Sequence, residues 1–258
     1  MLKTLFPVLK TGLILKKEAL ESIRDFPRDF LDVFYKNQSD GIISGCEIEI
    51  KEHEIIVHEG IVKFKNIIYF SKEKQVINYS NFNEEVILKF EFREKELNEI
   101  FEVYGVDLII DGNLIVNKNQ MEIGRFKLKV GAILRSTYVN FEDLATEYNT
   151  FNIINAKFSG DEASTLNPLV LKTFGNELNK YEISNIDDAI FITTCINSKL
   201  VERKVIENYI RKKFKSDTSR YTNQEIYKNL LKIYLSIKNG GRLQESVQRV
   251  RPNKIIVD

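Results

Sequence analysis

The sequence has little of what metal proteins and histidine-dependent enzymes need. Its 258 residues include only two cysteines, Cys46 and Cys195, and two histidines, His53 and His58. Two cysteines so far apart form neither a disulfide framework nor a CxxC pair, so we expect two buried free thiols. The histidines are five residues apart, whereas the helical zinc motif needs a separation of four. We therefore predict no metal site, no cofactor and no catalytic residue.

Long apolar runs and phosphate-binding loops are also missing. A membrane helix needs about 20 consecutive apolar residues, and the apolar runs here span only a few. No signal-peptide pattern follows the basic N-terminus. Neither GxxxxGK[ST] nor GxGxxG occurs, so the sequence has no recognisable loop for binding nucleotide phosphates. We predict a folded protein, made in the cytoplasm, that does not insert into membranes and is not an enzyme. An enzyme with an unrecognised site remains an alternative.

The charge is balanced in total but uneven along the chain. There are 38 basic and 37 acidic residues, for a net charge of +1. From residue 196 onward there are 15 basic and 6 acidic residues, so this last quarter of the chain carries a net charge of +9 and the preceding residues carry −8. Such asymmetry favours an acidic protein partner, or contact between the basic end of one copy and the acidic body of another. A solvated, lysine-rich helix surface explains the same charges.

The first 39 residues are predicted to form a helical segment. Within residues 17–36 the apolar side chains recur every three or four positions, which places them on one face of a helix: Leu20, Ile23, Phe26, Phe30, Leu31 and Phe34. Pro27 removes a hydrogen bond and clashes with the preceding turn. We therefore predict two short helices with a break near Pro27, the second of them capped by Asp25.

Residues 40–140 change to a period of two and are predicted to form an antiparallel β-sandwich or barrel. In residues 46–50, 86–92 and 126–130, apolar side chains alternate with charged ones, Lys89 among them, as in strands with one wet face. Lys65-Asn66 is a turn signal. Asp111-Gly112 lies between two apolar runs and predicts a tight hairpin.

Residues 141–240 are predicted to form a helical domain. Asn167-Pro168 begins one helix, Ser184 caps the next with Asp187 and Asp188 behind it, and Thr222 with Glu225 forms a capping box. A further helix covers residues 201–214, and Gly240-Gly241 ends the last one. The expected apolar faces follow helical spacing: Val170, Phe174 and Leu178; Ile190, Thr193 and Ile196; Val201, Val205, Tyr209 and Phe214; Ile226, Leu230, Ile233 and Ile237.

Residues 241–258 are predicted to form an extended arm. They contain Pro252 and finish with Ile255, Ile256 and Val257. We expect residues 253–257 to add a strand to the sheet edge of a neighbour. The fold class is therefore α+β, with domain boundaries near residues 40, 141 and 241. Eight residues are candidates for protein–protein contacts: Arg211, Lys212, Lys213, Arg249, Arg251, Ile255, Ile256 and Val257.

Several short motifs resemble a family of particle components. LKTLFP at residues 2–7, DFPRDFL at 25–31 and DGIISGC at 40–46 are similar to the baseplate or tail-fibre-attachment proteins of contractile phage tails. R-type bacteriocins of low-G+C Gram-positive bacteria carry related proteins. EGIV at 59–62 and NIIY at 66–69 extend the resemblance through about residue 70, and residues 141–199 match more weakly.

The resemblance implies a structural subunit, assembled in the cytoplasm and then part of a virion or a released tail-like particle. Its partners would be other baseplate or tail-fibre subunits in a symmetric, multi-copy assembly, and no catalytic residue comes with the family. No fibre shaft follows in the sequence, which favours an adaptor or baseplate component. The alternative is a nucleic-acid-binding accessory protein that uses the basic C-terminal helices, although no helix-turn-helix or RNA-recognition motif orders their charges.

Overall fold

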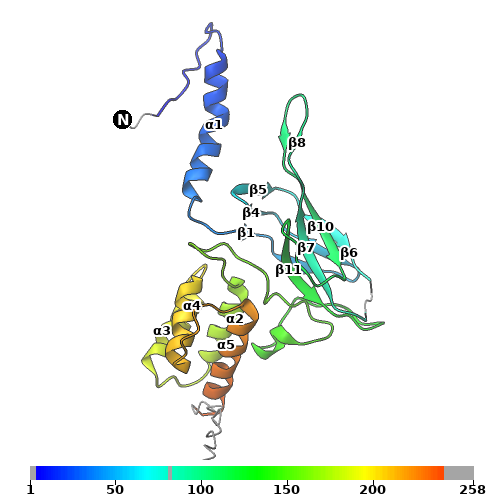
Figure 1. Ribbon diagram of the computed structural model, residues 1–258, viewed down its shortest axis with the longest axis vertical. Helices are drawn as coiled ribbons and strands as arrows, with labels where there is room; N and C mark the ends of the chain where they lie inside the picture. Colours follow the sequence, from blue (N-terminus) through cyan, green and yellow to red (C-terminus); the bar gives the residue numbers. More distant parts are fainter. Residues whose placement is uncertain (1–3, 81–82, 241–258) are drawn as a thin grey trace, which may run out of the picture.

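The computed structural model describes residues 4–80 and 83–240 and has mixed α and β structure (Figure 1). The α+β class expected from the sequence is confirmed. The helices are α1 (Lys17–Phe34), α2 (Pro168–Leu178), α3 (Ile186–Asn197), α4 (Arg203–Phe214) and α5 (Asn223–Lys238), with a short 3-10 turn at Glu142–Ala145. The strands are β1 (Gly41–Gly45), β2 (Ile48–Ile50), β3 (Glu54–Val57), β4 (Gly60–Phe64), β5 (Ile67–Ser71), β6 (Gln75–Asn78), β7 (Val86–Phe92), β8 (Glu96–Leu97), β9 (Glu102–Val103), β10 (Val106–Asp111) and β11 (Gln120–Phe126).

The strands pair antiparallel in small sheets. Three sheets have three strands each, in the orders β1-β4-β5, β2-β3-β6 and β10-β7-β11, and β8 with β9 forms a two-stranded ribbon. Phe64 of β4 stacks on Phe92 of β7 with ring centroids 3.8 Å apart, which joins the first sheet to the third. Within the residues described, the sheets do not close on themselves, so the barrel alternative is wrong.

Two glycines explain why β1 and β4 can pair so closely at one end. Gly45 lies opposite Gly60 in the antiparallel register. A Cβ on Gly45 would lie 2.1 Å from the carbonyl oxygen of Glu59, and one on Gly60 would lie 2.5 Å from Cys46 Sγ. Gly45 also has a φ of 71°, a conformation that a side chain disfavours. The glycines of the GIISGC and EGIV motifs are therefore required by the backbone.

Lys89 corrects two expectations about the β region. The alternation predicts that Lys89 lies on the wet side of its strand, but β7 is central in its sheet and Lys89 is fully buried. Its ammonium donates to the Asp111 carboxylate at 2.8 Å and to the carbonyl oxygens of Asn113 and Ile115 at 2.7 and 2.8 Å. The chain after Asp111 therefore wraps around this cation and does not return in a tight hairpin. Both β10 and β11 pair with β7.

The third expected strand, at residues 126–130, also needs correction. β11 covers Gln120–Phe126, so residues 127–130 of the expected strand lie after its end. Leu128 is nevertheless buried, although it lies outside a strand. The period-two pattern thus predicted the burial of Leu128 correctly, but it placed this residue in a strand that ends two residues earlier.

The helical domain confirms most of the predicted helix ends. Asn167 accepts a hydrogen bond from the Leu169 amide with Pro168 in the first turn, and Thr222 and Glu225 form the complete capping box. Asn185, one residue beyond the expected Ser184, caps α3. The predicted face of α3 is wrong, because Ile190 is exposed while Phe191, Ile192 and Cys195 are buried.

Phe141 is fully buried and packs against α2 and α5. Its ring centroid is 5.2 Å from Phe174 of α2 and 5.0 and 5.7 Å from Tyr227 and Tyr234 of α5. The Tyr227 hydroxyl donates to the Phe141 carbonyl at 2.9 Å. Aromatic pairs at these separations stabilise a core beyond the apolar area they bury.

The N-terminal helix is one element and not two. α1 continues through Pro27, and Asp25 lies inside it, where it accepts hydrogen bonds from Arg24. Proline leaves the carbonyl four residues earlier, that of Ile23, without its helical partner. No residue of α1 is buried, so water can satisfy this carbonyl. None of the helices within the described residues combines the length and apolarity that crossing a bilayer requires.

Candidate protein–protein interface

α1 extends away from the body of the molecule and leaves its apolar face uncovered (Figure 1). Phe30 is 58% exposed and Phe34 65% exposed, whereas apolar faces of ordinary helices are buried against a core. All apolar side chains of the face share this exposure: Leu20, Ile23, Phe26, Phe30, Leu31, Val33 and Phe34. A contiguous exposed apolar surface of this kind is typical of a protein contact site.

The residues before α1 turn back along it and add to the same surface. Phe6 packs near Phe26 with ring centroids 5.9 Å apart, and the Ser22 hydroxyl donates to the Leu5 carbonyl at 3.3 Å. The apolar side chains of this segment are exposed as well: Leu5, Phe6, Val8, Leu9, Leu13, Ile14 and Leu15. We call residues 5–34 the α1 arm.

A buried lysine fixes the base of the α1 arm to the β region. Lys63 of β4 is 4% exposed, and its ammonium donates to the carbonyl oxygens of Tyr35, Lys36 and Gln38 at 2.6, 3.2 and 2.7 Å. These carbonyls follow the last turn of α1, where the helix dipole places partial negative charge. The cation therefore ties the residues that directly follow the helix to β4.

The β8–β9 ribbon forms a second projection at the same end of the molecule (Figure 1). Its apolar side chains Leu97, Ile100 and Phe101 are 64–79% exposed. The positive charge of Arg28 on α1 contributes, after the larger effect of Lys95, to lowering the pKa of Glu102 on β9. Arg28 of α1 is therefore close enough to β9 for its charge to act on Glu102.

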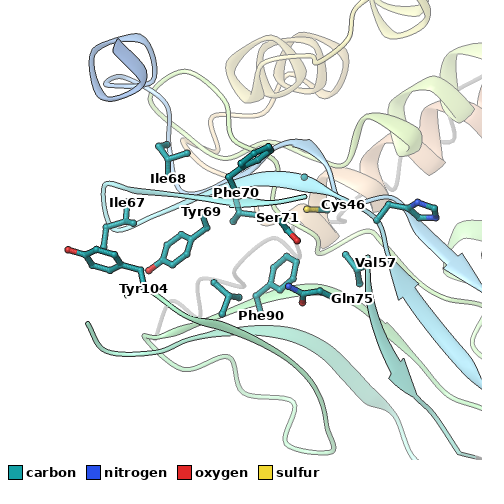
Figure 2. Close-up of a pocket in the computed structure, with 14 residues that line it drawn as sticks. Cys46, Val57, Ile67, Ile68, Tyr69, Phe70, Ser71, Gln75, Phe90 and Tyr104 are labelled. Carbon is teal, nitrogen blue, oxygen red and sulfur yellow. The ribbon is translucent and has the colours of Figure 1, made fainter. Parts of the chain in front are cut away.

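A pocket of about 370 Å³ lies beneath β5, between the first and third sheets. Figure 2 shows Tyr69 and Ser71 pointing from β5 toward Phe90 and Gln75, while Ile68 and Phe70 point the opposite way. The walls are mainly apolar and include Val57, Val62, Ile67 and Val106. The volume is at the lower end of the range for small-molecule sites, about 300 to 1,000 Å³, and is large enough for a side chain of a partner.

The predicted basic contact residues on α4 are engaged within the chain. Lys213 pairs with the buried carboxylate of Asp188 at 2.6 Å, and Lys212 pairs with Asp187 at 2.7 Å. Arg211 donates to Asn208 at 2.6 Å and to the Ser219 carbonyl at 3.2 Å. Asp187 and Asp188 thus have a second role beyond the helix start. The other five predicted contact residues lie outside the described residues: Arg249, Arg251, Ile255, Ile256 and Val257. The structure therefore does not test whether the eight residues form one surface.

The two thiols are buried, as the sequence predicts. Cys46 and Cys195 are free and buried, and burial raises the pKa of each to about 12. His53 and His58 lie beyond opposite ends of β3, and His58 Nε2 is 3.0 Å from a Glu49 carboxylate oxygen. In the part of the chain described, no three His, Cys, Asp or Glu side chains gather as metal ligands would.

No protein-family model matches the chain, and no curated protein sequence is significantly similar to it. Among solved structures, the fold resembles the crystal structure of TssK, with a TM-score of 0.45 and 11% identity over 93% of this chain and 72% of that chain. It also resembles a chain of the TssK-TssF-TssG baseplate subcomplex of the type VI secretion system, solved by cryo-electron microscopy. There the TM-score is 0.41 with 7% identity over 92% of this chain and all of the other. At these scores and identities, the likeness carries no function over to this chain.

Sequence reasoning identified the apolar side chains of α1 but not their exposure, and it missed the exposed side chains of the β8–β9 ribbon. The apolar stripe of α1 is visible in the spacing of its residues, but that spacing does not say whether another part of the chain covers it. The fixing of α1 by Lys63 has no local signal, because Lys63 and Tyr35 are 28 residues apart. The pocket beneath β5 depends on how two sheets meet and has no sequence motif.

Proposed function

We propose that the chain is a structural subunit of a contractile phage tail or phage tail-like particle, located in the baseplate or at the tail-fibre attachment point. The observation that carries the proposal is the α1 arm, a helix with a continuous apolar face and no buried residue. Keeping such a face in water is unfavourable by about 25 cal/mol for each Å² that a partner would otherwise cover. The arm therefore has the properties of a docking element.

The motif resemblance in residues 2–70 supports the choice of particle. GIISGC and EGIV form the paired ends of β1 and β4, and DFPRDFL lies in α1, so the resembling motifs fall in the arm and in the strands that hold it. The partners would be other baseplate or tail-fibre subunits, bound by the α1 arm and by the β8–β9 ribbon beside it. The protein would act through contacts and not through catalysis, and would be made in the cytoplasm before it joins the particle in several symmetric copies.

Co-sedimentation tests this proposal directly. Contractile particles would be purified from an induced culture of the source strain, and the protein would be quantified against the sheath or tube subunit. A fixed ratio that persists through a second gradient is the expected result. If the protein stays soluble while intact tails pellet, the proposal fails. A DNA-affinity titration with salt would then examine the alternative, since phosphate contacts weaken steeply as salt rises.

A further inference from the structure

Strand β5 is an open edge of its sheet. It pairs with β4 on one side, and among the described residues no strand pairs with its other side. The turn at Lys65 and Asn66 has positive φ at both positions, 48° and 65°, which is the geometry of a two-residue hairpin. Phe64 and Ile67 close this turn as a hydrogen-bonded pair. The alternation along the strand then directs the main-chain N–H and C=O of Ile68 and Phe70 away from β4, toward the open edge.

The pocket beneath this edge has room for further side chains. Where Phe64 stacks on Phe92 the two sheets touch, but farther along β5 a pocket with mainly apolar walls lies between Tyr69, Phe90 and Val106. Figure 2 shows that this space lies on the side of β5 to which Tyr69 and Ser71 point. A strand added at the edge would direct every second side chain into the pocket. Proteins that bind peptides by β-addition use this arrangement. Main-chain hydrogen bonds form at the sheet edge, and a pocket accepts alternate side chains of the peptide.

We infer that the edge of β5 accepts the C-terminal segment of a second copy, residues 253–257, whose isoleucine or valine side chains fill the pocket. This inference is independent of the kind of particle proposed above. The segment is predominantly apolar and follows Pro252, a residue tolerated at the start of a strand. The last 18 residues carry four basic and two acidic side chains, whereas residues 40–140 carry 13 basic and 17 acidic ones. The charges of the segment and of the acceptor domain are therefore complementary.

The place where the described chain ends leaves a neighbouring copy within reach. α5 runs away from the β region, so that the described chain ends at the opposite end of the helical domain (Figure 1). Eighteen further residues span at most about 60 Å when extended, which is enough to reach an adjacent molecule. Exchange between copies also provides the symmetric repetition that a multi-copy subunit needs.

A proline at the edge tests the acceptor. Ile68→Pro removes the N–H that faces the open side while leaving the pairing with β4, and edge strands tolerate proline there. Ile68→Val keeps the N–H and is the matched control. In the full chain, light scattering after size-exclusion chromatography should show association weakened at least about tenfold by Ile68→Pro, and not by Ile68→Val. Near-ultraviolet circular dichroism verifies that both variants are folded. Unchanged association of folded Ile68→Pro would overturn the inference.

Disulfide capture tests the occupant. Full-length Phe70→Cys and full-length Ile256→Cys would be mixed and oxidised at pH 8, and a mixed dimer on a non-reducing gel is the expected result. The native thiols give little background, because their pKa of about 12 leaves them protonated at this pH. Two matched mixtures, Phe70→Cys with Thr218→Cys and Val76→Cys with Ile256→Cys, control for random collision. Equal yields in all mixtures, or no mixed dimer from Phe70→Cys and Ile256→Cys, would rule out a second copy as the donor.

Discussion

α5 and α1 have similar amphipathic sequences but different surroundings. α5 has 16 residues and buries Ile226, Leu230 and Ile233 against the rest of the helical domain. α1 has 18 residues and buries none. Both sequences place apolar side chains at helical spacing, so the pattern specifies that a face must be covered. It does not specify which molecule covers it.

The two helices also differ in how their ends are fixed. The capping box of Thr222 and Glu225 satisfies the start of α5 locally, within four residues. α1 has no side-chain cap at its start, and the carbonyls that follow its end bind Lys63 from a distant strand. Local signals therefore define α5, whereas α1 depends on a tertiary contact at one end and, by our proposal, on another subunit along its length.

The largest expected effect on stability comes from a substitution in the buried face of α5. Leu230→Ala removes a fully buried side chain from α5 and should lower the free energy of unfolding by about 2 to 5 kcal/mol. Leu20→Ala in α1 is the matched control, since Leu20 is 52% exposed. It should change stability by less than about 0.5 kcal/mol. Urea denaturation followed by circular dichroism measures both. Similar losses for the two variants would show that α1 belongs to the core, contrary to the structure.

A smaller effect is expected at the base of the α1 arm. Lys63→Met keeps the length of the side chain but removes the ammonium, so the carbonyls of Tyr35 and Gln38 lose their donor. Leaving such groups unsatisfied costs about 1 to 3 kcal/mol. Hydrogen exchange should accelerate in residues 31–38 more than elsewhere, because the end of α1 is released. Lys65→Met, at an exposed neighbouring position, is the control and should leave exchange in this segment unchanged.

Acid should weaken the body of the molecule through Asp143. The guanidinium of Arg135, 2.6 Å away, holds the pKa of the Asp143 carboxyl below its usual value. A carboxyl with a lowered folded-state pKa stabilises the protein fully above its unfolded pKa of about 4 and loses this contribution as the pH falls through the folded value. The free energy of unfolding should therefore decrease below about pH 4. Asp143→Asn should be less stable than the parent at pH 7 and show a smaller decrease in acid. An identical decrease in both proteins would exclude Asp143 as a source of the acid sensitivity.

Local chemistry made much of the fold predictable. The caps at Asn167 and Thr222, the turn at Lys65 and Asn66, and the buried faces of α2 and α5 all follow from residues within a few positions of each other. The predictions failed at positions whose burial or backbone path depends on groups far away in the sequence. Lys89 has the spacing of a surface residue, but the carbonyls gathered around it allow burial of its charge. The Asp111-Gly112 turn gives way to a loop for the same reason.

The candidate interface was less predictable than the fold. Charge counting selected Lys212 and Lys213, which pair with Asp187 and Asp188 in this structure, because a count along the chain does not show which opposite charges are neighbours in space. The stripe of α1 was recognised from its spacing, and only the three-dimensional arrangement shows it uncovered. Exposure is a property of the whole fold, so a single helix sequence cannot report it.

The smallest effect on stability should accompany a large effect on assembly. Phe30→Asp places a charge in the middle of the exposed face of α1, where Phe30 loses only its stacking with Phe34 at 5.8 Å. The free energy of unfolding should therefore change by less than about 1 kcal/mol. Incorporation into particles, measured by co-sedimentation, should fall strongly because a partner would have to bury the new carboxylate. Ile190→Asp, on the exposed side of α3 at 60% exposure, is the matched control and should incorporate normally. If Phe30→Asp incorporates as well as Ile190→Asp, α1 is not the docking element, and the difference between α1 and α5 has another cause.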